Sequence, residues 1–194
     1  MNRILVLFAH PAAHKSRIHK RLSEAARSVE GLTFNDLYAK YPDFYIQVKR
    51  EQQLLLEHDI IVWQHPLYWY SCPALLKEWI DLVLEHNFAF GKAGTFLKGK
   101  KLVSAISTGG SAHVYSEEGS NICTIPQFLA PFHQTALQCG MEYLPPYVVH
   151  GSHLLGKAEI RNYGEQYKIL LEKLRDNTLP AEKLSNAAYL NELI

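Results

Sequence analysis

The sequence has few cysteines and almost no net charge. Cys72, Cys123 and Cys139 are widely spaced and form no C-x-x-C pair, which argues against a disulfide framework or a thiolate metal cluster and favours a reducing compartment. Twenty Lys and Arg residues against nineteen Asp and Glu give a formal net charge of +1. No large charge excess exists to drive binding to an anionic membrane or to nucleic acid, and no nucleic-acid partner is expected.

Long apolar runs and the common nucleotide-binding fingerprints are missing as well. The apolar run before His10 and Pro11 is too short for a signal peptide, and no run approaches the roughly 18 residues needed to span a bilayer. Neither G-x-G-x-x-G nor G-x-x-x-x-G-K-[ST] occurs, so a bound phosphate would be held by a different kind of loop. We expect a cytoplasmic protein whose 194 residues form one well-buried core.

Short apolar runs alternate five times with segments of helical periodicity. The predicted strands cover residues 4–8, 32–38, 60–63, 101–107 and part of 141–150. The predicted helices cover residues 16–29, 48–57, 73–84, 126–139 and 158–174. Helical crossovers between strands imply a parallel sheet with helices on both faces. The more polar segment 176–194 is either docked through its apolar residues or frayed.

The first predicted strand leads into a loop suited to an anion. In doubly wound sheets, ligands bind beyond the carboxyl ends of the strands. Ser16 is the predicted N-cap of the helix that follows, where free amides and the helix dipole can hold a phosphate with help from Ser16 and from His19 or Arg17. The alternative is an ordinary capped turn.

Two further strand ends suit a planar ring. Tyr68, Trp69 and Tyr70 are consecutive aromatics at a strand end, where they form either a wall for a planar cofactor or a hydrophobic plug or subunit contact. The segment 107–111 offers consecutive backbone amides with little side-chain obstruction, which suits an electron-rich ring edge or an anion. Phosphate, ring and amide functions in three adjacent loops together indicate a flavin nucleotide site.

Together these motifs resemble those of the flavodoxin-like NAD(P)H:quinone oxidoreductases. The resemblance covers roughly residues 3–175 and rests on His10-Pro11 with Ser16, on residues 66–70, and on residues 108–111 with Tyr115. The stretches WQHPLYWYSCPALLKEWID, LYAKYPDF and GMEYLPPYVVH are most similar to the ancillary oxidoreductases of glutathione-gated potassium-efflux systems, a branch of that family.

The resemblance implies a fold and a cofactor site. The implied fold is α/β, a flavodoxin-like doubly wound five-stranded parallel sheet of order 2-1-3-4-5 with helices on both faces. Residues 1–175 would form this domain, and residues 176–194 a tail packed on the domain or on a partner subunit. The implied protein is a homodimer with one flavin per subunit, FMN rather than FAD because the chain is short. The implied flavin-binding residues are His10, Ser16, Arg17, Ile18 and His19 at the phosphate, Pro66, Leu67, Tyr68, Trp69 and Tyr70 along the ring, and Ser107, Thr108, Gly109 and Gly110 at its pyrimidine edge.

The resemblance also implies an activity. NADH or NADPH would reduce the flavin, and a quinone would then replace the nicotinamide and accept two electrons in a ping-pong reaction. Tyr115 matches a family tyrosine near the site of hydride transfer, which makes it the implied catalytic residue. The histidine that accompanies this tyrosine in animal enzymes is here Asn121, with His113 as a substitute. Phe88 and Phe90 would close the pocket from the neighbouring subunit.

Other assignments remain beside this one. A non-catalytic flavin-binding regulatory subunit of a membrane potassium-efflux transporter is the alternative of a different class, and a flavodoxin-like electron carrier is disfavoured by the near-zero charge. Metal binding by the histidines of the first loop is disfavoured, because Lys15 and Arg17 repel a cation. Cys72 fits a packed cysteine better than a redox thiol, and Asp81 with Glu85 fits a solvated helix face better than a catalytic pair.

Overall fold

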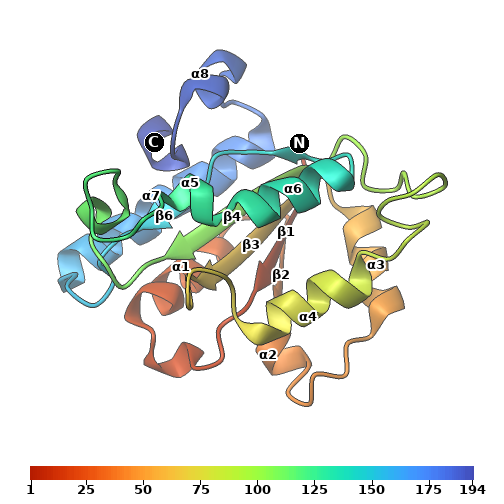
Figure 1. Cartoon of the computed structure of the whole chain (residues 1–194), viewed down its shortest axis with the longest axis horizontal. Helices are drawn as coiled ribbons and strands as arrows, with labels where there is room; N and C mark the ends of the chain where they lie inside the picture. Colours follow the sequence, from red (N-terminus) through yellow and green to blue (C-terminus); the bar gives the residue numbers. More distant parts are fainter.

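A computed structural model describes residues 1–194, and its centre is a six-stranded parallel sheet (Figure 1). The strands are β1 (Ile4–Phe8), β2 (Leu32–Asp36), β3 (Ile60–Pro66), β4 (Lys101–Ser107), β5 (Glu142–Tyr143) and β6 (Tyr147–Val149). Five of them follow the order β2-β1-β3-β4-β5, and β6 also pairs with β4. The predicted strand order 2-1-3-4-5 is therefore confirmed, and the prediction of five strands missed the sixth.

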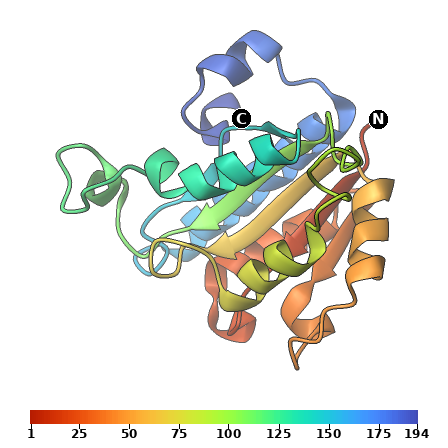
Figure 2. The same ribbon diagram turned by 45° about the vertical axis from the view of Figure 1, so that its right-hand side comes forward.

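Helices cover both faces of the sheet, as Figures 1 and 2 show. Helices α1 (Arg17–Arg27) and α7 (Lys157–Asp176) lie on one face. Helices α3 (Val48–Glu57), α4 (Ala74–Val83) and α6 (Ala130–Gln138) lie on the other. The shorter elements are α2 (Leu37–Lys40), α5 (Ile125–Phe128), α8 (Ala181–Asn186) and the 3-10 helices η1 (Ala13–Lys15), η2 (Ala112–Tyr115) and η3 (Leu190–Leu193).

The central strands are apolar on both faces because helices cover them on both sides. Leu5 and Leu7 of β1 pack in the core beneath α4, whereas Ile4 and Val6 pack in the core beneath α1, and all four are fully buried. This burial fixes the register of β1 between β2 and β3, so that the strands end together at one edge of the sheet. The loops that follow β1, β3 and β4 are thereby brought side by side.

Prolines explain two differences from the predicted elements. The single strand predicted within residues 141–150 is two short strands, because Pro145 and Pro146 have no N–H to donate to the ladder. The helix predicted over residues 126–139 is divided into α5 and α6 at Leu129, just before Pro131 enters the first turn of α6. The strand predicted over residues 32–38 ends earlier, at Asp36, whose carboxylate caps α2.

The C-terminal segment lies against the edge of β6. Leu190 is fully buried, and its N–H donates to the carbonyl of Pro146 at 2.9 Å. The side-chain amide of Asn191 pairs with both backbone groups of Val148, at 2.8 and 3.0 Å. The edge of β6 is therefore hydrogen-bonded by a side chain instead of by another strand. None of the helices combines the length and the apolar character that crossing a membrane requires.

Candidate functional site

A cavity of about 610 Å³ opens where β1, β3 and β4 end. Four loops line it, namely those after β1, β3, β4 and β6. The lining residues are His10, Ala12, Lys15, Ser16, Arg17, Ile18, Pro66, Leu67, Tyr68, Trp69, Ser107, Thr108, Gly109, Ser152 and His153. The position matches the carboxyl edge at which open α/β sheets bind their ligands.

One end of the cavity is built to receive an anion. Ser16 is the N-cap of α1, as predicted, and its Oγ accepts a hydrogen bond from the N–H of His19 at 3.2 Å. The amides of Arg17 and Ile18 in the first helical turn have no acceptor within the protein. The exposed side chains of Lys15 and Arg17 add two positive charges at this end. Free amides, the helix dipole and these cations together favour a phosphate.

Two buried histidines lie next to this anion site, one in the wall of the cavity and one behind it. The N–H of Ala12 donates to Nδ1 of His10 at 3.0 Å, and burial lowers the pKa of His10, so its imidazole is neutral with the proton on Nε2. His19 is fully buried, and burial holds its pKa well below the ordinary value. Its Nε2 lies 2.9 Å from Oγ of Ser107, and its Nδ1 has no hydrogen-bond partner. His19 therefore supports the cavity from behind Ser107 and does not line it.

The aromatic loop after β3 has an unusual backbone. Trp69 and Tyr70 both have positive φ values, 47° and 62°, although neither is glycine. Their amides have no acceptor within the protein, and the side chain of Trp69 is 92% exposed at the cavity. Tyr70 turns away and stacks on Phe128, with ring centroids 4.9 Å apart. Tyr68 and Trp69 line the cavity, whereas Tyr70 does not.

The loop after β4 presents two free amides. Gly109 and Gly110 donate to no acceptor within the protein. Two backbone hydrogen bonds connect this segment to the end of β6 and the loop after it. The N–H of Thr108 donates to the carbonyl of Val149 at 2.9 Å, and the N–H of Gly151 donates to the carbonyl of Gly110 at 2.8 Å. The free amides are therefore fixed in place before any ligand binds.

Tyr115 lies behind Gly110, outside the cavity lining. It is 9% exposed, and burial raises the pKa of its phenol, which therefore stays protonated at neutral pH. Its ring packs edge-on against Phe128 and lies 5.8 Å from the imidazole of His150. His113, the substitute partner considered from the sequence, is exposed on η2. The imidazole that contacts Tyr115 is that of His150.

Sequence reasoning missed one side of the cavity. Ser152 and His153 line it, and the side chain of Arg17 donates to the carbonyl of His153 at 3.4 Å. Residues 150–153 follow the last strand, and because open α/β sheets bind ligands beyond the carboxyl ends of their strands, this strand end is also a candidate from the sequence. Of the residues predicted to bind the cofactor, His19, Tyr70 and Gly110 are the ones that do not line the cavity.

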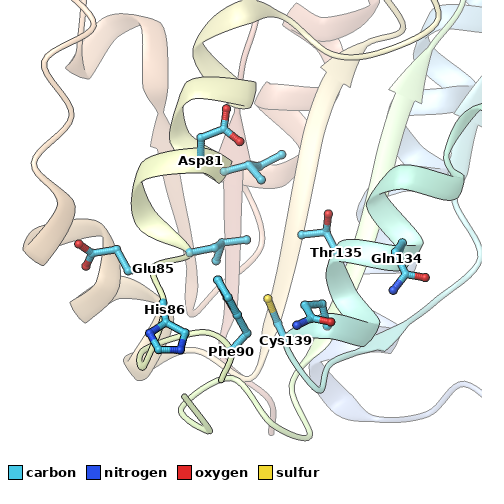
Figure 3. A pocket seen from close by; sticks show the side chains of 10 residues that line it. Asp81, Glu85, His86, Phe90, Gln134, Thr135 and Cys139 are labelled. Atoms are coloured by element: carbon cyan, nitrogen blue, oxygen red, sulfur yellow. The ribbon is translucent and has the colours of Figure 1, made fainter. Parts of the chain in front are cut away.

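A second cavity, of about 730 Å³, lies between α4 and α6 (Figure 3). It is near the C-terminal ends of these helices and therefore at the opposite edge of the sheet. Asp81 forms an ion pair with Lys77, and the carboxylate of Glu85 lies 3.5 Å from the ammonium group of Lys49. These two carboxylates are therefore solvated charged groups. Burial raises the pKa of Cys139 to about 11 and also raises that of Cys72, so neither is a reactive thiolate. The lining of the second cavity contains no Lys or Arg, whereas Lys15 and Arg17 line the first cavity.

Comparison with known proteins shows similarity along most of the chain. Residues 2–171 match the family described as the flavodoxin-like fold, a range that contains every residue of the first cavity. The chain is 42% identical over 178 residues to the glutathione-regulated potassium-efflux system ancillary protein KefG of Erwinia tasmaniensis, covering 92% of this chain and 95% of that protein. It is 39% identical to general stress protein 14 of Treponema denticola, solved in complex with FMN, with a TM-score of 0.85 over 89% of this chain and 99% of that one. An NADPH-quinone reductase from P. pentosaceus is 31% identical, with a TM-score of 0.79 over 89% and 97% of the two chains.

Proposed function

This chain belongs to the flavodoxin-like fold family, and from that premise we propose that it is an FMN-dependent NAD(P)H:quinone oxidoreductase. The observation that carries the proposal is a set of free amides at one cavity. Those of Arg17, Ile18, Trp69 and Gly109 belong to residues that line the cavity, and those of Tyr70 and Gly110 follow directly in the same loops. Three strand ends contribute them, and each set suits a different part of one flavin nucleotide. The FMN of general stress protein 14 and the name of the NADPH-quinone reductase support the same choice.

The residues present fit FMN. The phosphate would lie on the first turn of α1, held by Ser16 Oγ, by the amides of Arg17 and Ile18 and by Nε2–H of His10. The ring would lie along Leu67 and Trp69. Cations at the phosphate end and neutral, hydrogen-bonding walls elsewhere match the charge distribution of this ligand.

The residues of this chain would then perform the supporting chemistry. When bound, FMN supplies the two-electron chemistry, accepting a hydride from NAD(P)H and passing the electrons to a quinone. The amides of Gly109 and Gly110 would donate hydrogen bonds to the pyrimidine edge and would stabilise negative charge there. The hydroxyl of Tyr115 stays protonated beside this loop and would donate a hydrogen bond to an acceptor oxygen. One cavity serves both substrates, so they bind in turn, which is a ping-pong scheme.

Helix α4 supports a homodimeric arrangement. It begins just after the aromatic loop 68–70 and ends just before Phe88 and Phe90. Ten helical residues separate the two ends by about 15 Å, so Phe88 and Phe90 cannot reach the cavity of their own subunit. A two-fold axis across antiparallel α4 helices would bring these residues of one subunit to the aromatic loop of the other. We therefore propose that the partner subunit closes the cavity.

A regulatory role is the second candidate, and the similarity to KefG is the observation that favours it. In that case the chain would dock on a membrane potassium-efflux transporter, with the flavin serving as a structural or signalling group. The two roles are compatible, because both require the same flavin site. Turnover of a quinone separates the enzyme from the purely regulatory subunit.

Anaerobic titration of the FMN-loaded protein tests the proposal. NADH or NADPH is added while the flavin absorbance is followed, and menadione is added after bleaching is complete. We expect bleaching by at least one nucleotide and recovery of the oxidised spectrum on addition of menadione. Failure of both nucleotides to bleach the flavin would refute the reductase. Bound FMN without turnover above that of free flavin would favour the regulatory subunit.

A further inference from the structure

The C-terminal segment reaches the loop that presents the free amides. The ring of Tyr189 meets the imidazole of His150 edge-on, with centroids 6.1 Å apart and planes at 89°. Nδ1 of the same imidazole lies 3.3 Å from Oγ1 of Thr108, and the imidazole lies 5.8 Å from the ring of Tyr115. A single imidazole therefore connects the end of the chain to the Thr108–Gly110 loop.

The direction of the hydrogen bonds follows from a count of protons. The hydroxyl of Thr108 has one proton, which it donates to the carbonyl of Gly110 at 2.8 Å. Its oxygen must then accept from His150, so the imidazole carries a proton on Nδ1. Burial lowers the pKa of His150, which makes the neutral form with this single proton the stable one. His150 thus orients the hydroxyl that closes the turn at Gly109.

The position of Tyr189 is itself fixed. Leu190 is fully buried, and Asn191 makes two hydrogen bonds to Val148, two residues before His150 in the chain. The hydroxyl of Tyr189 makes no hydrogen bond within the protein, so its contact with His150 is made by the ring. The segment therefore positions an aromatic ring in contact with the imidazole.

We infer that Tyr189 and His150 are positioning residues for the amides of Gly109 and Gly110, so that the C-terminal segment 187–194 controls the geometry of the flavin site. Tyr189 acts by limiting the rotation of the imidazole, and His150 acts through the hydroxyl of Thr108. The inference rests on the proposed function for the identity of the ligand. The coupling between residue 189 and the loop can be measured without any ligand.

Three variants test this coupling. Tyr189→Ala removes the ring, and Tyr189→Phe keeps it. Tyr163→Ala is the control. It removes a partly buried tyrosine of α7 that packs in the core beneath α1 and α7, on the other side of the sheet from Tyr115. The first readout is the set of backbone amide resonances of residues 108–110 in the FMN-free protein, recorded by 1H–15N NMR. The second is the dissociation constant of FMN together with its bound absorption spectrum, and the third is kcat with menadione.

We expect Tyr189→Ala to shift the resonances of residues 108–110, alter the bound flavin spectrum and lower kcat on the order of tenfold. Tyr189→Phe should restore the resonances and the spectrum, and Tyr163→Ala should lower the thermal midpoint without moving either. If Tyr189→Ala does not fold, Asn191→Ala releases the segment without altering a residue that contacts His150, and it should give the same shifts.

Two results would overturn the inference. Unchanged resonances and an unchanged flavin spectrum in Tyr189→Ala, or in Asn191→Ala in its place, would show that the segment does not position the loop. Equal changes in Tyr163→Ala would show a general loss of stability instead of a specific contact. Wild-type protein that binds no FMN would refute the proposed function alone, and the resonances of the FMN-free protein would still decide whether the segment positions the loop.

Discussion

Replacing Ser16 by aspartate separates the two roles assigned to this side chain. In the structure, Ser16 Oγ caps α1 by accepting from the N–H of His19 at 3.2 Å, and it also lines the cavity beside the free amides of Arg17 and Ile18. Aspartate is as good an N-cap as serine, so the stability of the FMN-free protein should stay within about 0.5 kcal/mol. Ser16→Ala loses the cap and should cost about 1 kcal/mol.

The effect of Ser16→Asp on FMN binding should be far larger. Two unit charges about 4 Å apart repel by about 4 kcal/mol at an effective dielectric constant of about 20. If screening halves this value, a phosphate charge of about −1.5 still leaves about 3 kcal/mol. Because 1.4 kcal/mol corresponds to a factor of ten, the affinity for FMN should fall about a hundredfold. Ser16→Ala lacks the added charge and should lose roughly tenfold, from one hydrogen bond to a charged group.

Flavin fluorescence titration measures both affinities, and riboflavin provides the control because it lacks the phosphate. Riboflavin should bind the wild type and Ser16→Asp with similar affinity, since the aspartate has no phosphate to repel. Urea unfolding of the FMN-free proteins confirms that the helix cap is intact. Undiminished FMN affinity in Ser16→Asp would refute the placement of the phosphate on the first turn of α1.

Three further predictions concern residues around the cavity. His65 is fully buried, and burial lowers its pKa to about 4. Below pH 6.5 the unfolded chain therefore takes up a proton that the folded chain does not. As a result, the free energy of unfolding should be about 2 kcal/mol lower at pH 5 than at neutral pH. Urea unfolding should show a smaller loss between pH 7 and 5 in His65→Gln, and equal losses would contradict this. Gly110→Ala places a Cβ 3.2 Å from the side chains of Tyr115 and Val114, and it should weaken FMN binding about tenfold by displacing them. In the control Gly109→Ala, the Cβ contacts only the side chain of His153, at 3.4 Å, and FMN titration should show little change in affinity. Tyr115→Phe should lower quinone turnover by up to about a hundredfold and leave the FMN content unchanged. Equal losses of quinone turnover and FMN content would argue against a catalytic role of Tyr115.

Features encoded by short-range chemistry were predictable from the sequence. The buried run Ile4–Phe8, the cap at Ser16 and the crossover helices are local patterns, and together with the family motifs they led to the correct strand order. The pair Pro145-Pro146 was also visible, and its effect on the last strand follows from the missing N–H groups. Residues 141–150 were predicted to contain a single last strand, so the sixth strand was not predicted.

The contacts of His150 depend on long-range packing. His150 is 42 residues from Thr108 and meets it only because β6 pairs with β4 in register. The contact between Tyr189 and the imidazole depends on how the C-terminal segment docks, and Asn191 holds this segment by hydrogen bonds to the edge of β6. Nothing in the spacing of these residues along the chain indicates that they meet.

Trp69 and Tyr70 both have left-handed backbone conformations, so substitutions that stabilise the protein at these positions would remove part of the binding site. For an L-residue this conformation costs roughly 1–2 kcal/mol, so the pair stores about 3 kcal/mol in a protein whose total stability is about 5–15 kcal/mol. Glycine or asparagine would adopt the same backbone at little cost. A library screened for heat resistance alone should therefore enrich glycine and asparagine at positions 69 and 70, and the more stable survivors would have lost the wall of their own binding site.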